Sequence, residues 1–348
     1  CDFGVLRVAA RLAVVGAGLI GLRHIAAIAA AAGATLAAVI DPAAASRQVS
    51  ARDGVPWFPC LENMPDGIAD GIILATPNNL HVAGGLAAIE RNLPVLVEKP
   101  IATDLAGARV LVEAGEIAGV PVLTGHHRRY NPLIVAAKSM IVAGRIGRIV
   151  SVHGMFWLAK PDDYFDVAWR RQPGAGPVFV NLIHDIDLLR HLVGEVVAVQ
   201  AQTANTARGH AVEETAVVLL EFANGALGTV NISDTVPAPW SWELTSGENS
   251  AYPPTDQACY MIGGTEGSLD LPRLRLWRHE GKRSWWSPIV AETPPRGHGD
   301  PLIIQIEHFA AVIRGDTTPL VSGHEGLKSL AVIEAILTAA ATGRRVEL

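Results

Sequence analysis

The residues with the clearest chemical purpose are three glycines near the start of the chain, Gly16, Gly18 and Gly21. They form a Gly-x-Gly-x-x-Gly pattern that follows an apolar, strand-like run and precedes a helix-like stretch. The first glycine permits a tight turn, the second lets the backbone approach a pyrophosphate, and the third allows close packing of helix against strand. Free N–H groups at the helix start would meet the phosphates. The pattern therefore predicts a dinucleotide site that includes Leu19 and Ile20.

A carboxylate follows the next apolar run. The run Leu36–Ile40 ends in Asp41, which lies 20 residues beyond Gly21. A carboxylate at this position can accept both ribose hydroxyls of an adenosine, and it would repel a 2′-phosphate. We therefore expect NAD as the cofactor and weaker binding of NADP.

Polar residues also follow the third apolar run, where Thr76, Pro77 and Asn78 precede His81. Pro77 fixes the backbone, and Thr76 and Asn78 offer polar groups where a cofactor ribose would lie. We predict that these four residues line the cofactor. The alternative is a helix entry capped by Asn78 or Asn79.

A lysine closes the fourth apolar run, in the sequence Glu98-Lys99-Pro100. At the carboxyl edge of a parallel sheet, its ammonium would face the nicotinamide end of the cofactor crevice. There it could hydrogen-bond a substrate hydroxyl and lower the pKa of that hydroxyl. We predict that Lys99 is catalytic and that Glu98 and Lys99 both lie against the cofactor. The alternative is a surface Glu–Lys pair of little energetic value.

A histidine in the second half of the chain is another candidate for proton transfer. His184 starts a helix-like stretch within Asn181–Asp187, and an imidazole that titrates near neutrality suits removal of a proton from an alcohol. The alternative is a structural histidine at a helix start. Upstream, Trp169 and Arg170 could offer a stacking surface and a hydrogen-bond donor for a polyol or a sugar carboxylate. They could equally belong to a covering loop.

Two kinds of domain are needed to position these residues. In residues 1–124, apolar runs alternate with helix-like segments, which indicates a doubly wound parallel sheet of the Rossmann type. The ligand should lie beyond the carboxyl ends of its strands. The expected strands are Leu12–Val15, Leu36–Ile40, Gly71–Ala75, Val95–Val97 and Val120–Thr124. The expected helices are Leu22–Ala32, Ala43–Asp53, His81–Arg91 and Leu105–Ala118.

Residues 125–348 have a different pattern, typical of an α+β domain with a large, mostly antiparallel open sheet covered by helices on one face. Asn224-Gly225 between two strand candidates is a good hairpin turn. The expected strands are Ile149–Phe156, Val196–Thr203, Glu214–Phe222, Leu227–Ser233, Cys259–Ile262 and the tail Arg345–Leu348. The expected helices are Asn131–Ala143, His184–Leu192, Pro301–Ile313 and Gly323–Ala341.

Composition excludes several other classes of protein. With 348 residues, 49% of them apolar and 18% charged, the chain is long enough for two globular domains. A net charge of −6 without a long basic run argues against a nucleic-acid partner. Arg23 and His24 interrupt the Ala-rich stretch Leu12–Ile40, so no membrane span is expected.

We expect no metal, because His126 and His127 lack a third ligand at suitable spacing. Three cysteines and no recognisable signal peptide favour the cytoplasm.

Taken together, these segments resemble the Gfo/Idh/MocA oxidoreductase family, which includes glucose–fructose oxidoreductase and inositol dehydrogenase. The resemblance covers nearly the whole chain and is carried by Gly16–Gly21, Glu98-Lys99-Pro100, Gly125–Tyr130, His184-x-x-Asp187 and the tail at Val346. It implies that Lys99 touches substrate and nicotinamide, that His184 is the catalytic histidine, and that Arg128 lies in a segment that reaches the active site. It also implies that the second domain binds substrate and contacts other subunits, so we expect a homodimer or homotetramer.

One position departs from the family pattern. The family often has Asp-x-Gly-x-His, whereas this chain has Val180 and Leu182 before His184. Val180 cannot relay a proton, but Asn181 could orient a substrate hydroxyl. Adjacent helix positions point about 100° apart, which argues against direct pairing of Asp185 with His184.

We therefore predict an NAD-dependent dehydrogenase that acts on a secondary alcohol of a sugar, cyclitol or related polyol. Asn181, Arg128, Arg170 and Trp169 would bind the substrate. Two alternatives remain open. The first is a non-catalytic protein of the same fold that binds NAD and a sugar and signals to a partner. The second keeps the cofactor but cleaves glycosides, or reduces an imine or a ketone.

Overall fold

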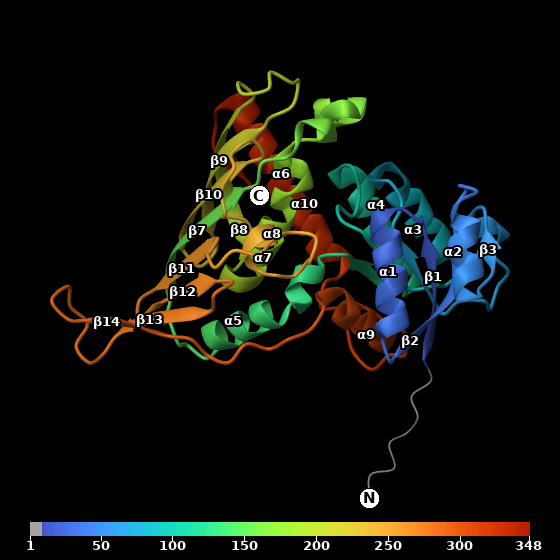
Figure 1. Ribbon diagram of the computed structural model, residues 1–348, viewed down its shortest axis with the longest axis horizontal. Helices are drawn as coiled ribbons and strands as arrows, with labels where there is room; N and C mark the ends of the chain where they lie inside the picture. Colours follow the sequence, from blue (N-terminus) through green and yellow to red (C-terminus); the bar gives the residue numbers. More distant parts are fainter. Residues whose placement is uncertain (1–8) are drawn as a thin grey trace, which may run out of the picture. The chain divides into compact units, whose positions relative to one another are not determined.

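The computed structural model describes residues 9–348, which form two compact units (Figure 1). The first unit contains the described residues up to Tyr130 together with Gly299–Leu330, and the second contains Asn131–His298 and Ala331–Leu348. This division differs from the single boundary expected after residue 124. The chain returns to the first unit because helix α9 (Pro301–Ile313) buries Ile306 and Phe309 in that unit's core.

The first unit is built on a six-stranded parallel sheet in the order β3-β2-β1-β4-β5-β6. The strand order reverses between β1 and β4, which is the topological switch point of a doubly wound sheet. The predicted Rossmann architecture is therefore confirmed. The strands are β1 (Ala10–Val15), β2 (Ala34–Ile40), β3 (Trp57–Phe58), β4 (Gly71–Leu74), β5 (Val95–Val97) and β6 (Val122–Thr124).

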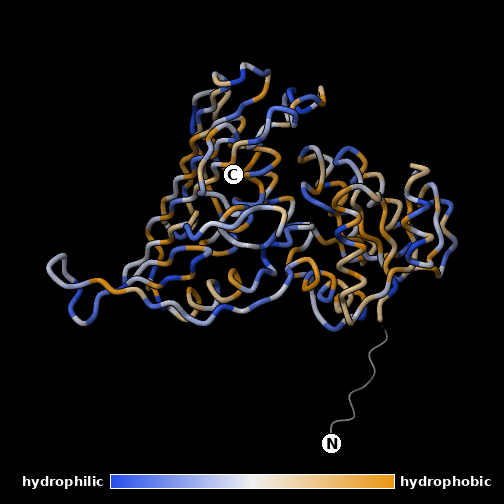
Figure 2. Tube along the Cα trace, viewed as in Figure 1, coloured by the Kyte–Doolittle hydropathy of each residue, from blue (hydrophilic) through white to orange (hydrophobic). Residues whose placement is uncertain are grey.

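Helices lie on both faces of this sheet, and the residues of its central strands are mostly apolar (Figure 2). Leu12, Val14 and Ile73 have no exposed surface. Asp104 caps the start of α4 by accepting a hydrogen bond from the Gly107 N–H. The α-helices are α1 (Leu19–Ala30), α2 (Ser46–Asp53), α3 (His81–Glu90), α4 (Leu105–Ala118) and α9. Short 3₁₀ segments are η1 (Leu61–Asn63), η2 (Asn78–Leu80) and η3 (His127–Tyr130).

The second unit is built on a nine-stranded sheet in the order β14-β13-β12-β11-β7-β10-β9-β8-β15. The β7–β10 pair is parallel and the other neighbouring pairs are antiparallel, which confirms the expected mostly antiparallel sheet. The strands are β7 (Ile149–Trp157), β8 (Val196–Ala204), β9 (Thr215–Phe222), β10 (Leu227–Ser233), β11 (Tyr260–Gly264), β12 (Ser268–Leu271), β13 (Arg275–His279), β14 (Ile289–Glu292) and β15 (Val346–Glu347).

Among the described residues, helices cover one face of this sheet (Figure 1). Strand β9 shows the consequence, since Val218 and Leu220 are buried beneath the helices while Val217 and Leu219 are 45% and 51% exposed. The other face is therefore both open and partly apolar. The covering elements are α5 (Pro132–Val142), α6 (Pro177–Val180), α7 (Leu182–Val193), α8 (Trp242–Thr245) and, from Ala331 onward, α10 (Gly323–Thr342).

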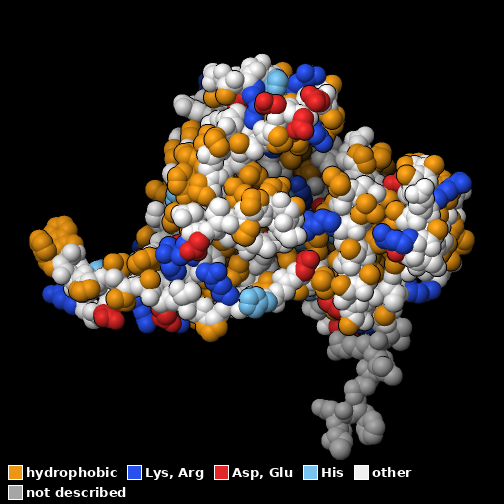
Figure 3. Space-filling model, viewed as in Figure 1, with side chains coloured by type: hydrophobic (Ala, Val, Ile, Leu, Met, Phe, Trp, Pro, Cys, Tyr) orange, Lys and Arg blue, Asp and Glu red, His pale blue; other side chains and the backbone are white. Residues whose placement is uncertain are grey.

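Strands β13 and β14 form an arm at one edge of the sheet. Residues 280–288 connect the two strands and carry Trp285 and Trp286, which are 89% and 86% exposed. Figure 3 shows hydrophobic side chains gathered at the end of this arm. Within residues 9–348, no helix combines the length and apolar character that crossing a bilayer requires.

Candidate functional site

The glycine pattern forms the turn between β1 and α1. Gly16 has φ +94°, and a Cβ there would lie 2.6 Å from the carbonyl oxygen of Ala75. A Cβ on Gly21 would lie 1.9 Å from the carbonyl oxygen of Gly16. Both positions therefore require glycine so that the turn can pack against its neighbours.

Gly18 is open where the other two glycines are packed. A Cβ there would meet no atom of the described residues within 4 Å. Its φ of −73° would also suit any residue, so neither packing nor backbone conformation requires a glycine at this position. Gly18 is also the N-cap of α1, next to Leu19, whose side chain is 90% exposed. Open space beside free N–H groups at a helix start suits a pyrophosphate. These residues therefore fit NAD.

Asp41 lies at the end of β2 beside this turn. One of its carboxylate oxygens accepts a hydrogen bond from the Ala17 N–H and the other accepts one from the Ala43 N–H, both at 2.7 Å. Each carboxylate oxygen can accept a second hydrogen bond. The carboxylate is thus fixed in place and still able to accept ribose hydroxyls.

The loop after β4 contains a buried polar atom that suits a ligand. The Thr76 hydroxyl oxygen is buried and meets no hydrogen-bond partner within residues 9–348. In that same range, no side chain caps η2, which starts at Asn78 directly after Pro77, or α3, which starts at His81. The His81 side chain has no exposed surface, and its ring nitrogens lie 2.8 Å from the Pro100 carbonyl oxygen and 2.9 Å from that of Thr76. His81 therefore contacts the backbone of two loops.

Glu98 and Lys99 follow β5, and the carboxylate of Glu98 faces the protein interior. It lies 2.7 Å from Nε2 of His24 and also accepts a hydrogen bond from the Lys99 backbone N–H at 3.1 Å. Burial by itself would raise the pKa of Glu98. The hydrogen bond and charge of His24, with smaller contributions from His127 and Lys99, outweigh burial and lower the pKa to about 2. Glu98 is thus a buried anion, not half of the surface Glu98–Lys99 pair considered as the alternative.

Arg128 lies in η3, directly after β6, and is 5% exposed. Its neighbour Arg129 is also buried and forms an ion pair with Glu325 at 2.8 Å. This segment is therefore a packed part of the first unit. In the part of the chain that the structure describes, no three His, Cys, Asp or Glu residues are grouped to hold a metal ion.

In the second unit, α6 ends at Val180 and Asn181 connects it to α7. The Asn181 side-chain oxygen is buried and has no hydrogen-bond partner among the residues that the structure describes, so it fits a ligand hydroxyl. His184 lies in the first turn of α7 and is 8% exposed. The carboxylate of Asp185 accepts a hydrogen bond from the hydroxyl of Tyr260 on β11.

Trp169 and Arg170 belong to the segment 158–176, which contains η4 (Asp162–Asp166) and η5 (Ala168–Arg171). Trp169 is 57% exposed. The Arg170 guanidinium lies 4.1 Å from the centre of the Tyr164 ring and donates to the Tyr164 carbonyl oxygen at 2.9 Å. Arg170 is therefore held by its own segment.

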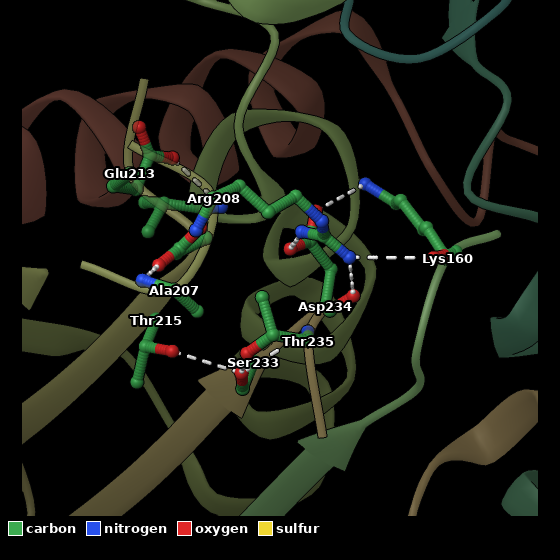
Figure 4. Close-up of polar contacts among 10 residues, drawn as sticks. Lys160, Ala207, Arg208, Glu213, Thr215, Ser233, Asp234 and Thr235 are labelled. Atoms are coloured by element: carbon green, nitrogen blue, oxygen red, sulfur yellow. Dashed lines mark hydrogen bonds and ion pairs between the residues drawn. The ribbon is translucent and has the colours of Figure 1, made fainter. Parts of the chain in front are cut away.

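A polar cluster fixes the base of this segment (Figure 4). The Asp234 carboxylate, after β10, lies 3.0 Å from the Lys160 ammonium and 2.6 Å from the Arg208 guanidinium. Arg208 also donates to the Lys160 carbonyl oxygen at 3.3 Å and stacks 4.3 Å from the Phe165 ring. Burial lowers the pKa of Lys160, and Asp234 opposes this shift. Sequence reasoning missed this cluster because its members come from separate segments that share no motif.

No functional role for His24 could be predicted from the sequence alone. It lies on the buried side of α1, three residues beyond Gly21, and contacts Glu98 across 74 positions of sequence. The sequence shows only a histidine in the helix that follows the glycine pattern. It does not reveal that this histidine is buried or that its partner is Glu98.

Comparison with known proteins assigns the class. Residues 10–126 match a family model described as an oxidoreductase-family, NAD-binding Rossmann fold, and residues 138–348 match the C-terminal alpha/beta domain of the same oxidoreductase family. The protein is thus an oxidoreductase with an NAD-binding domain. More specifically, the chain belongs to the Gfo/Idh/MocA oxidoreductase family.

Several members of this family are similar over almost their full length. The rhizopine catabolism protein MocA of Rhizobium meliloti is 28% identical, with 93% of each chain covered. The NAD(+)-dependent scyllo-inositol 2-dehydrogenase of Bacillus subtilis is 27% identical, with 97% of this chain and 96% of the relative covered. The WlbA dehydrogenase of Bordetella pertussis, crystallised with NADH and UDP-GlcNAcA, is 29% identical, with 98% and 99% coverage and a TM-score of 0.79.

Proposed function

We propose that this oxidoreductase transfers hydride between NAD and a secondary alcohol of a sugar, cyclitol or related polyol. The observation that carries the proposal is the open space at Gly18 beside the start of α1, with the Asp41 carboxylate fixed next to it. The substrate class is supported by the names of the relatives, which include inositol, levoglucosan and D-apiose dehydrogenases.

The cofactor would lie along the turn Gly16–Gly21, with Leu19 and Ile20 at the start of α1. Asp41 would accept the adenosine ribose hydroxyls, and this carboxylate is the reason to expect NAD more than NADP. The segment Thr76–Asn78 and residues Glu98 and Lys99 would complete the site, with Thr76 supplying a hydroxyl that needs a partner. When bound, NAD supplies the acceptor for a hydride.

Lys99 and His184 would both contact the reacting hydroxyl. One of them removes the hydroxyl proton as the carbinol C–H bond breaks, the hydride goes to the nicotinamide, and a carbonyl forms on the substrate. Asn181 would orient a neighbouring hydroxyl through its unsatisfied side-chain oxygen. Arg128, Arg170 and Trp169 would bind the rest of the substrate.

The test is a panel of polyols and sugars assayed for reduction of NAD. Lys99→Met and His184→Asn should each lower turnover by roughly two to four orders of magnitude, because each removes a group that acts in proton transfer. Lys282→Met and His298→Asn are matched controls, since both side chains are exposed. Near-normal rates in both test variants would exclude Lys99 and His184 from the chemistry.

Val180 is the observation that favours a second candidate function. Because a valine stands where the family often has an aspartate, the fold could serve as a non-catalytic sensor of NAD and a sugar. Tight NADH binding without any cofactor reduction across the panel would support the sensor. Release of free sugar without net NADH would instead indicate glycoside cleavage.

We also propose a homo-oligomer in the cytoplasm. The open face of the nine-stranded sheet exposes the apolar side chains of Val217 and Leu219. They line a hollow of about 490 Å³ together with neighbouring polar side chains. Exposed apolar side chains gathered at a hollow are typical of a surface that contacts another protein chain. Leu219→Glu should lower the mass measured by light scattering, whereas an unchanged mass would place the contact elsewhere. The cytoplasm is supported by Cys60 and Cys259, which are free thiols.

A further inference from the structure

Two buried histidines lie on either side of the Glu98-Lys99-Pro100 segment in the first unit. His24 belongs to α1 and His81 begins α3, and neither has any exposed surface. Both contact this segment, His24 at Glu98 and His81 at Pro100. They therefore reach the residues before and after Lys99.

The contact of His24 continues to the backbone of Lys99. The ring donates from Nε2 to one Glu98 oxygen at 2.7 Å, and the other oxygen accepts the Lys99 N–H at 3.1 Å. The Glu98 carboxylate is also tightly packed, because a Cβ added to Gly125 would lie 3.1 Å from it. The buried Glu98 carboxylate thus joins helix α1 to the backbone of Lys99 through two hydrogen bonds.

The contact of His81 joins two loops. Its Nδ1 lies 2.8 Å from the Pro100 carbonyl oxygen and its Nε2 lies 2.9 Å from the Thr76 carbonyl oxygen. Carbonyl oxygens only accept hydrogen bonds, so a neutral ring can donate to one of them and an imidazolium to both. In either state the ring lies between the loop that follows β4 and the loop that follows β5.

We propose that His24 and His81 are positioning residues that set Lys99 for proton transfer, His24 through Glu98 and His81 through Pro100. The proposal rests on the proposed function, since it assumes that Lys99 acts on the substrate. Both bridges start at parts of the chain expected to hold NAD, namely α1 beside Gly18 and the loop with Thr76. Each histidine therefore joins a part of the chain expected to hold NAD to a residue next to Lys99.

The test compares variants that keep or remove a single hydrogen bond. The amide nitrogen of Gln corresponds to Nε2 of His, and that of Asn corresponds to Nδ1. His24→Gln therefore keeps the bond to Glu98 and His24→Leu removes it. His81→Asn keeps the contact with Pro100, whereas His81→Gln keeps only the contact with Thr76.

We expect His24→Leu and His81→Gln to lower kcat by at least about tenfold while the Kd for NADH changes by less than about threefold. His24→Gln should keep kcat within about threefold of the parent enzyme, and His81→Asn should keep a higher kcat than His81→Gln. A readout without cofactor is amide hydrogen exchange of Glu98, Lys99 and Ile101, which should speed up in His24→Leu and His81→Gln and stay slow in the two conservative variants.

His24→Leu could fail to fold because it removes the side-chain hydrogen bond of the buried Glu98 anion and leaves it only the Lys99 N–H among the contacts described above. The double variant His24→Leu/Glu98→Gln removes that charge as well as the bridge, so it should fold and still have a low kcat. Normal kcat and normal exchange in the folded double variant, or equal behaviour of His81→Asn and His81→Gln, would overturn the inference.

If Lys99→Met keeps full activity, the proposed role of Lys99 fails and this inference fails with it. If Lys99→Met is inactive and the histidine variants are normal, this inference alone fails.

Discussion

Replacing Gly18 with alanine should separate cofactor binding from folding. The Gly18 backbone, at φ −73° and ψ −168°, is accessible to alanine, and its Cβ would meet no described atom within 4 Å. The variant loses unfolded-state entropy, which stabilises it by about 0.4–1 kcal/mol. Because Gly18 is the N-cap of α1 and alanine is a poorer N-cap than glycine, a loss of similar size opposes this gain. The free energy of unfolding should therefore change by less than about 1 kcal/mol, and the melting temperature by less than about 4 °C.

The same methyl group would occupy space that we assign to the pyrophosphate. Gly18→Ala should therefore weaken NADH binding by about 10- to 100-fold, which corresponds to about 1.4 to 2.7 kcal/mol. Isothermal titration calorimetry measures the affinity, and scanning calorimetry of the protein without cofactor measures the stability. The prediction is thus a protein of nearly unchanged stability that binds its cofactor less well.

Gly21→Ala is the matched control. Its Cβ would lie 1.9 Å from a backbone oxygen that cannot move freely, so the fold should lose about 1–3 kcal/mol of stability along with cofactor affinity. Parental NADH affinity in Gly18→Ala would show that the pyrophosphate does not pass over this turn. A melting temperature of Gly18→Ala that falls by more than about 4 °C would contradict the open space found there.

Three further predictions concern charged groups. Asp41→Ser should raise the affinity for NADP relative to NAD by at least about tenfold, since it removes a carboxylate that would repel a 2′-phosphate; titration with both cofactors measures the ratio. Glu98 has a pKa of about 2 in the folded protein against 4.5 as its ordinary value, so its ionised form stabilises the fold above pH 4.5 and this contribution is lost as pH falls towards 2. The full contribution is on the order of 3 kcal/mol, and about 1 kcal/mol of it should be lost by pH 3.5. Denaturant unfolding of Glu98→Gln should lack this part of the pH dependence. Arg208→Lys should raise KM by about tenfold and leave kcat within about threefold, because Arg208 holds the segment expected to bind substrate and not the reacting groups.

Each of these predictions has an outcome that contradicts it. An unchanged cofactor ratio in Asp41→Ser would mean that the carboxylate only supports the glycine turn. Parallel stability curves for Glu98→Gln and the parent from pH 7 to 3.5 would show that Glu98 is not held ionised by His24. A large fall in kcat with an unchanged KM in Arg208→Lys would place the cluster of Figure 4 in the chemical step.

Much of the fold could be predicted because local patterns determine it. Strand β5 and helices α4 and α9 have the predicted bounds, since each is a clear apolar run or an amphipathic repeat with strong ends. Helix α1 begins at Leu19, three residues earlier than expected, because the helix starts inside the glycine pattern. Strands β12, β13 and β14 were not predicted, since they have only four or five residues each, too few for a clear periodic pattern.

The parts that could not be predicted depend on contacts between distant residues. An amphipathic repeat identifies α9 as a helix but does not say whose core it enters, and α9 enters the first unit. The pair His24–Glu98 is a similar case, because a spacing of 74 residues has no local signature. Motifs indicated the candidate site residues, whereas the buried residues that support them required the structure.

The most direct measurement follows the hydrogen of the reacting carbon. A polyol that is oxidised by the enzyme is prepared with deuterium on its secondary alcohol carbon and is incubated with NAD. We expect deuterated NADH and ketone in equal amounts, and a loss of both in Lys99→Met and in His184→Asn. Deuterated NADH formed at the parental rate by both variants, or product that keeps its deuterium while no NADH accumulates, would contradict it.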